Sequence, residues 1–137
     1  MDQQSIDHAP VDWYFDFISP FAYLQWHRLR QEAPSLALRP VPVLFAALLA
    51  HWDNKGPVEI PPKRGWTYAH CLWIARRHGI AMQLPTGHPF NPLPLLRLSI
   101  ALGYTTEVID RLFAYVWRDG HLPDSAADWQ ALLDELG

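Results

Sequence analysis

Ser19 and Pro20 form the part of this sequence that is best placed to do chemistry. They follow a short aromatic run, residues 11–17, and precede apolar residues at helical spacing. Ser is a preferred N-cap and Pro suits the first helical position, so the pair predicts the start of a helix. A helix N-terminus carries unpaired N–H groups and the positive end of the helix dipole, and it favours an anion such as a ligand thiolate. A plain helix cap explains the same two residues, and spacing alone leaves both interpretations open.

The other residues with reactive side chains form no cluster in the sequence. The seven His are spread singly, and none forms the i, i+4 pair of a helical zinc site, so no metal site is predicted. Cys71 lies among apolar residues of a predicted helix and is expected to be buried rather than reactive. For Trp66, Trp73 and Trp117, packing in the core or in a dimer interface is favoured over stacking on a ligand.

The elements that must position the Ser-Pro turn form a strand–helix–strand unit. Residues 11–17 predict a strand buried on both faces except around its two Asp, and the helix after Ser19 ends before Pro34. Residues 36–45 predict a second strand. Pro40 and Pro42 lack N–H groups at a spacing of two, which is typical of an edge strand. A right-handed βαβ unit follows from this order.

The rest of the chain predicts helices. The expected helices cover residues 44–51, 63–78, 93–102 and 106–119, followed by a last helix opened by a capping box at residues 125–128. Gly79, Gly103 and Gly120 are expected to end three of them. The predicted organisation is α/β, with a flexible N-terminus at 1–10, a βαβ part at 11–46 and a helical domain at 47–137.

Composition excludes several classes of protein. The chain has 137 residues, of which 50% are hydrophobic, so it is long and apolar enough to fold around a core. A net charge of −3 argues against a nucleic-acid surface, and no apolar run reaches membrane-spanning length. A single Cys forms no internal disulfide, and the first residues lack the pattern of a signal peptide. A cytoplasmic protein is therefore expected.

Four segments carry a resemblance to a known family. Residues 15–24, which read FDFISPFAYL, resemble the active-site turn of the DsbA-like thioredoxin superfamily, with Ser19 and Ala22 where redox members have Cys. Residues 53–64, 88–93 and 113–120 are similar to further family segments, although Asp53 and Gly56 depart from the pattern. The Ser form resembles the 2-hydroxychromene-2-carboxylate isomerase family and the kappa-class glutathione transferases. Without both thiols, disulfide exchange is excluded.

The resemblance implies a thioredoxin-like fold in which a helical insertion follows the βαβ unit. In the family a closing ββα unit carries a Val-Pro-Thr turn with a cis-proline, and this sequence has no such turn. We therefore expect the C-terminal half of the thioredoxin fold to be absent. The resemblance also implies a homodimer.

The resemblance further implies glutathione as cofactor and a small aromatic carboxylate as substrate. Ser19 would be catalytic by donating a hydrogen bond to the glutathione thiolate. Glutathione would contact Ser19, Pro20, Phe21, Asn54 and Lys63, and the substrate would contact Asn54, Pro57, Trp66 and Asn91. Asn54 is equally explained as a turn residue and Lys63 as a solvated charge, and His70 stands where many relatives carry Asp. The implied activity is cis–trans isomerisation, and the alternatives are a kappa-class transferase or an inactive truncated fragment.

Overall fold

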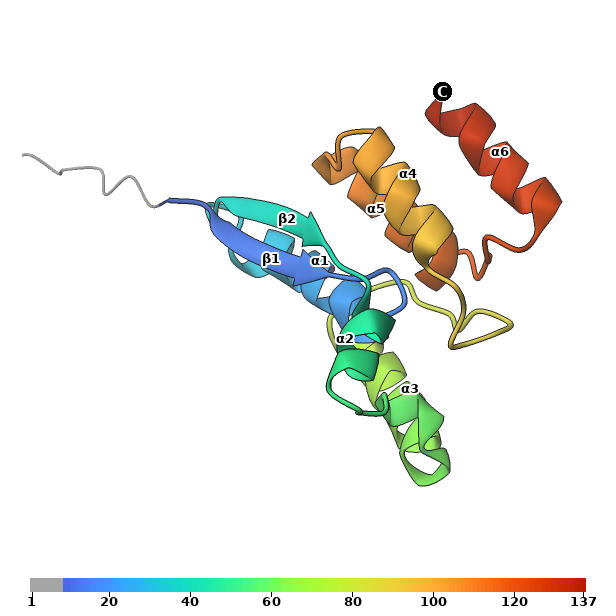
Figure 1. Cartoon of the computed structure of the whole chain (residues 1–137). Helices are drawn as coiled ribbons and strands as arrows, with labels where there is room; N and C mark the ends of the chain where they lie inside the picture. The colour runs from blue at the N-terminus through green and yellow to red at the C-terminus, as the bar shows by residue number, and fades with distance from the viewer. Residues whose placement is uncertain (1–8) are drawn as a thin grey trace, which may run out of the picture.

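The computed structural model describes residues 9–137 as two strands and six α-helices (Figure 1). The strand β1 (Val11–Phe15), the helix α1 (Pro20–Glu32) and the strand β2 (Leu38–Pro42) come first. Then follow α2 (Phe45–His51), a 3₁₀ turn η1 (Pro57–Glu59), α3 (Pro61–Arg77), α4 (Leu93–Ala101), α5 (Thr106–Trp117) and α6 (Ala126–Leu136). The predicted α/β class and the order of its elements are confirmed.

The sheet consists of β1 and β2, which run parallel with Val11 opposite Leu38 and Phe15 opposite Pro42. The amide of Val11 donates to the carbonyl of Ala37 at 2.8 Å, and Val43 donates to Phe15 at 2.9 Å. The odd-numbered residues at both ends of β2 therefore direct their backbone N–H or C=O groups toward β1. The nitrogens of Pro40 and Pro42 point away from β1. The prediction of an edge strand is confirmed for the sheet of the described residues.

The first strand is shorter than predicted and buries different side chains. It ends at Phe15, because Asp16 and the residues after it fold into a turn in which the Ser19 amide donates to the Asp16 carbonyl at 3.2 Å. Tyr14 is 63% exposed, whereas Asp16 is only 3% exposed. The expectation of a strand buried except around its two Asp was therefore wrong at both residues.

The helices follow the predicted pattern with small corrections at their ends. α3 begins at Pro61 rather than at Lys63, because two consecutive Pro fit the first turn, where no backbone donor is needed. Gly79, Gly103 and Gly120 all have positive φ, as expected for residues that end helices.

The capping box predicted at the start of α6 does not form. The Ser125 hydroxyl donates to the Asp128 carboxylate at 2.6 Å and caps no backbone amide. Ser125 still precedes the helix, so the position of the helix was predicted correctly and the hydrogen bond was not.

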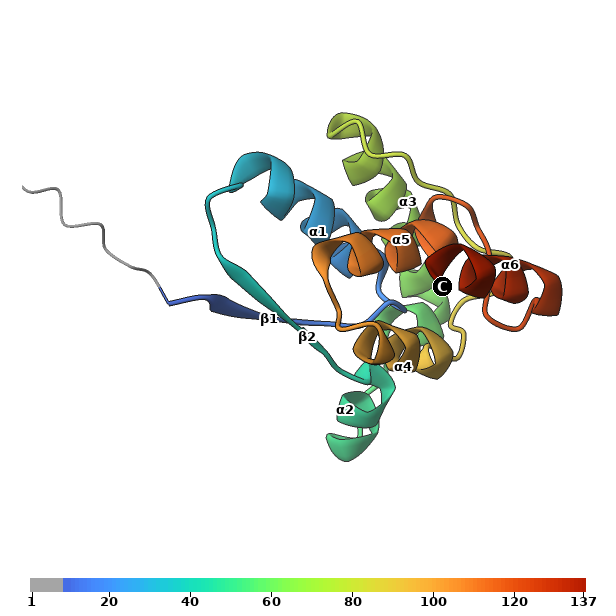
Figure 2. The same ribbon diagram turned by 90° about the horizontal axis from the view of Figure 1, so that it is seen from above.

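The core forms where α5 lies between α1 and α4 (Figure 2). α5 is strongly amphipathic, and its buried face meets an aromatic cluster from β1 and the turn after it. The members of that cluster are Trp13, Phe15 and Phe17, and Phe113 of α5 packs on all three. Trp117 is fully buried, as expected, whereas Trp66 and Trp73 lie exposed on α3 rather than in the core. No helix of the described chain is long and apolar enough to span a membrane.

Candidate functional site

Ser19 caps α1 and keeps its hydroxyl proton for another partner. Its backbone is extended, and its Oγ accepts a hydrogen bond from the Ala22 amide at 3.2 Å. Pro20 occupies the first helical position, as predicted. Because Oγ is used as an acceptor, the O–H is free to donate to a ligand. The cap and the anion-binding role are therefore compatible in one geometry.

The buried carboxylate of Asp16 holds the turn that carries Ser19. Its Oδ1 accepts from the Ile18 amide at 3.1 Å, and its Oδ2 accepts from the Phe45 amide at 2.8 Å. The second bond ties the turn to the start of α2. Burial raises the pKa of Asp16, and the bonds from Phe45 and Ile18 partly offset that rise because they stabilise the charged form.

Two aromatic side chains from the helical part of the chain contact backbone carbonyls of the same turn. The Trp117 indole Nε1 donates to the carbonyl of Phe17 at 2.8 Å. The His88 ring Nε2 lies 2.7 Å from the carbonyl of Ile18, and its Nδ1 lies 2.8 Å from the Tyr68 hydroxyl. The backbone on the N-terminal side of Ser19 is therefore fixed by α5 and by the segment between α3 and α4.

Ser19 opens onto a cavity of about 560 Å³, which we call the Ser19 cavity. It is lined by the Ser19 turn, one face of α2, the η1 turn and residues 88–90. Ser19, Pro20, Phe21, Asn54 and Pro57 all line it, so the structure brings together five of the predicted site residues. Its described lining has two ionisable side chains, Glu59 and His88. The lining of the cavity is mainly apolar.

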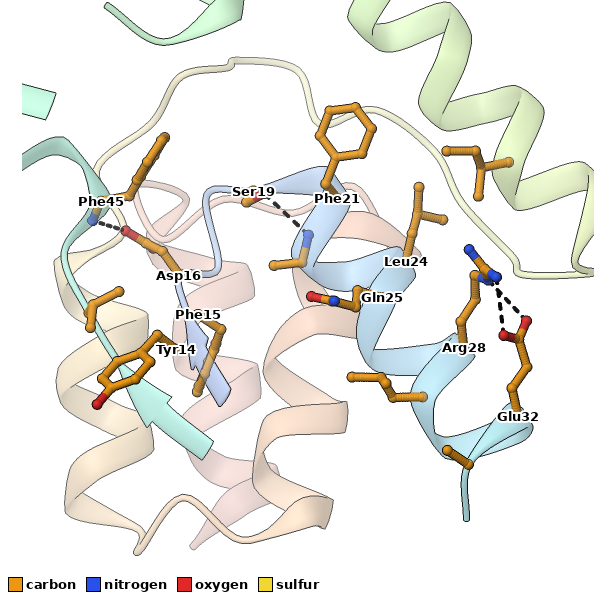
Figure 3. Close-up of a pocket in the computed structure, with 15 residues that line it drawn as sticks. Tyr14, Phe15, Asp16, Ser19, Phe21, Leu24, Gln25, Arg28, Glu32 and Phe45 are labelled. Atoms are coloured by element: carbon orange, nitrogen blue, oxygen red, sulfur yellow. Dashed lines mark hydrogen bonds and ion pairs between the residues drawn. The ribbon is translucent and has the colours of Figure 1, made fainter. Parts of the chain in front are cut away.

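A second hollow of about 680 Å³, the β1–α1 groove, meets the first at Ser19, Phe21 and Phe45. Figure 3 shows it between the end of β1 and the exposed side of α1. Arg28 lies at its far end, where its guanidinium pairs with Glu32 at 3.0 Å. Ser19 thus stands where two hollows join.

Three predicted site residues lie outside the Ser19 cavity. Lys63 is exposed in the first turn of α3. Trp66 is 64% exposed and stacks on His70 with their rings 4.8 Å apart. The Asn91 side chain accepts from the Leu93 amide at 3.1 Å, near the start of α4. None of these three residues belongs to the lining of the Ser19 cavity.

The described residues contain no group of three His, Cys, Asp or Glu side chains placed to hold a metal ion. Cys71 is fully buried, as predicted, and burial raises the pKa of its thiol to about 12. A thiol that stays protonated is a poor nucleophile. Ser19 is therefore the hydroxyl or thiol best placed for chemistry among these residues.

Sequence reasoning missed Asp16, His88 and Trp117 as supports of the Ser19 turn. Asp16 carried one usable signal, because a carboxylate between two Phe just before a turn can accept hydrogen bonds from the next amides. Trp117 and His88 lie 100 and 70 residues from the atoms they bind, and no local pattern predicts such pairs.

The fold and the site together define a class of protein. The family model of the DSBA-like thioredoxin domain matches residues 10–137, so the chain belongs to that family. Ser19 stands at the N-terminus of α1, at the turn where the redox members that the sequence resembles have thiols.

The named relatives are isomerases. The chain is 29% identical over 132 residues to a 2-hydroxychromene-2-carboxylate isomerase of Pseudomonas sp. (strain C18), and the match covers 93% of this chain and 62% of that protein. A protein of the same name from Pseudomonas putida is 26% identical, with 65% of its length covered. A solved structure of 2-hydroxychromene-2-carboxylate isomerase matches 94% of this chain and 66% of its own, with a TM-score of 0.73 at 24% identity, and shows the shared fold. The chain thus spans less than two thirds of its curated relatives.

Proposed function

We propose that this chain carries the isomerase activity named for its relatives, with glutathione as cofactor and a small aromatic carboxylate as substrate. The observation that carries the proposal is the Ser19 hydroxyl, which faces the Ser19 cavity from the N-terminus of α1. The names of the two Pseudomonas relatives support the reaction type.

The residues around Ser19 fit the thiol end of glutathione. At the start of α1, Pro20 has no N–H and the Ala22 amide donates to the Ser19 hydroxyl, while the Phe21 amide makes no hydrogen bond within the described chain. The Ser19 hydroxyl, this amide and the positive end of the helix dipole lie at the same helix terminus, and such a setting favours a thiolate. The carboxylates of glutathione find fewer partners, because Arg28 is the one Lys or Arg among the described residues that line the two hollows, and it pairs with Glu32.

The cavity also suits an aromatic carboxylate. Phe21, Phe45 and Phe90 supply apolar walls, and the Asn54 Oδ1 accepts from the Lys55 amide at 2.9 Å. The Asn54 NH₂ group is thereby directed away from its own backbone and serves as a donor for a carboxylate. Burial lowers the pKa of His88 and so favours its neutral form in this mainly apolar lining.

In this proposal Ser19 is an activator rather than a nucleophile. Bound glutathione would supply a thiolate that adds reversibly to the conjugated side chain of the substrate, so that the former double bond can rotate. Ser19 donates its proton in a hydrogen bond and holds the sulfur in its charged form. Such charge-assisted bonds are worth roughly 1.5–3 kcal/mol, which lowers a thiol pKa by about one to two units. Asn54 orients the carboxylate, and the aromatic walls exclude water.

Calorimetry with glutathione tests the cofactor, and an isomerisation assay with 2-hydroxychromene-2-carboxylate tests the reaction. We expect heat of binding with glutathione and much less with S-methylglutathione, which cannot form a thiolate. Ser19→Ala should abolish the isomerisation. Thr105→Ala is the matched control, because Thr105 also caps its helix by accepting from the amide three residues on, but it lines neither hollow. No heat at millimolar glutathione contradicts the cofactor, and a stable thioether product indicates a transferase instead.

A further inference from the structure

The hydrogen bonds of His88 determine which of its ring nitrogens carries the proton. The Ile18 carbonyl can only accept, so the Nε2 that lies 2.7 Å from it must be protonated. In the neutral ring Nδ1 is then bare, and the Tyr68 hydroxyl donates to it at 2.8 Å. Tyr68 and Ile18 therefore select one tautomer from opposite sides of the ring.

The bond to Ile18 acts directly on the backbone of Ser19. The Ile18 carbonyl and the Ser19 amide belong to one planar peptide unit, so fixing either group fixes the plane. The Ser19 amide, which points from the opposite edge of the same peptide unit, donates to the Asp16 carbonyl at 3.2 Å. His88 thus completes the clamp on this peptide and sets the direction in which the Ser19 side chain leaves the backbone.

The ring of His88 is itself held in place. It packs edge-on against Trp117 with ring centroids 5.3 Å apart and lies 6.0 Å from Phe90. Tyr68 comes from α3, whereas His88 comes from the segment between α3 and α4. The clamp therefore connects the helical part to the turn in front of α1, and His88 lines the same cavity as Ser19.

We propose that His88 is a positioning residue for Ser19, with Tyr68 holding it in the Nε2–H tautomer. The proposal rests on the proposed function in one respect, namely that Ser19 is the active group. It assigns no contact between His88 and substrate, because the ring acts through the Ile18 carbonyl.

The first test is ¹⁵N NMR of the imidazole in the free 137-residue chain, which requires neither cofactor nor activity. We expect a protonated Nε2 and a bare Nδ1 for His88. Tyr68→Phe removes the hydroxyl alone and should raise the share of the Nδ1–H tautomer, while the Ile18 carbonyl still favours Nε2–H. A protonated Nδ1 in the unchanged chain overturns the proposal, as does a tautomer unaffected by Tyr68→Phe.

The second test compares two replacements of His88 with a matched control. His88→Phe keeps a ring but no donor, and it should shift the Ser19 amide resonance and speed its hydrogen exchange. His88→Gln supplies an N–H near the position of Nε2 and should restore both signals in part. His27→Phe is the control, because His27 is a half-buried ring packed on Tyr23 that lines neither hollow. Unchanged Ser19 signals in His88→Phe overturn the proposal, and if that variant does not fold, Tyr68→Phe supplies the same readout.

Activity gives the third readout and separates the two proposals. If the isomerase activity is present, His88→Phe should lower kcat on the order of 100-fold, as for a displaced catalytic group, while the substrate KM stays nearly constant. His88→Gln should recover much of the loss. An unchanged kcat in His88→Phe overturns the positioning role. If the unchanged chain shows no activity, the proposed function fails, and the NMR results decide the role of His88 alone.

Discussion

Replacing Asp16 by Asn tests whether one buried carboxylate holds the Ser19 turn to α2. Both Asp16 oxygens accept backbone amides, from Ile18 at 3.1 Å and from Phe45 at 2.8 Å. Asn has the same shape but one acceptor oxygen, so its NH₂ group must face one of these two N–H groups. One charge-assisted bond, worth roughly 1.5–3 kcal/mol, is lost, and one N–H loses its partner.

The uncharged Asn side chain also removes the cost of burying a charge. In the parent chain this burial raises the pKa of Asp16 and disfavours its ionised form. The two effects on the free energy of unfolding oppose each other. The lost hydrogen bond and the unpaired N–H outweigh the gain from no longer burying a charge. We expect the free energy of unfolding to fall by roughly 2 kcal/mol.

Urea unfolding at neutral pH, followed by tryptophan fluorescence, measures this loss as a shift of the midpoint at constant m-value. Asp12→Asn is the matched control, since Asp12 lies on β1, four residues before Asp16, and its ion pair with Arg39 is at the surface. Such a pair contributes little, so this variant should unfold nearly as the parent does. Equal stability of the two variants would refute the role given to Asp16, as would unchanged hydrogen exchange at both Ile18 and Phe45.

Three further results are expected. Ser19→Ala should cost about 1 kcal/mol of stability as a lost N-cap, and a cost near zero in a thermal shift assay would show that the cap is not formed. Cys71 should resist thiol reagents in the folded chain, because burial raises its pKa to about 12, and should react once the chain is unfolded; fast labelling of the native chain would contradict its burial. Burial lowers the pKa of His27 and His88 below the unfolded value of 6.5, so the unfolded chain binds more protons below that pH. Their contribution to stability is complete above pH 6.5 and is lost as pH falls through the folded pKa values. His27→Phe and His88→Gln should flatten this dependence in urea titrations, and slopes equal to that of the parent would refute it.

Local signals in the sequence predicted the elements well. Ser19 and Pro20 predicted the start of α1, and Gly79 predicted the end of α3. Both signals are local, because an N-cap and a residue with positive φ affect only the adjoining helical turn. The prolines of β2 indicated an edge for the same reason, since a missing N–H is a property of the residue itself.

The supports of the site could not be predicted in this way. His88 was noticed only as part of a segment resembling a family, and Trp117 only as a residue expected to pack. Their bonds to Ile18 and Phe17 join parts of the chain far apart in sequence, and they depend on how α5 and the preceding segment pack on the turn. The burial of Asp16 was missed because alternation along a strand does not show where the strand ends.

The two prolines of β2 have a consequence for association between copies of the chain. Beyond β2 a neighbouring strand finds no N–H at Pro40 or Pro42, whereas the outward N–H and C=O groups of Asp12 and Tyr14 on β1 have no backbone partner in the described chain. Two copies of the chain can pair once through their β1 strands. The enlarged sheet then has a proline-containing β2 strand at each of its two edges. Edge-to-edge stacking therefore terminates at a pair, and the same residues that close one side of the sheet protect the chain against open-ended fibre growth.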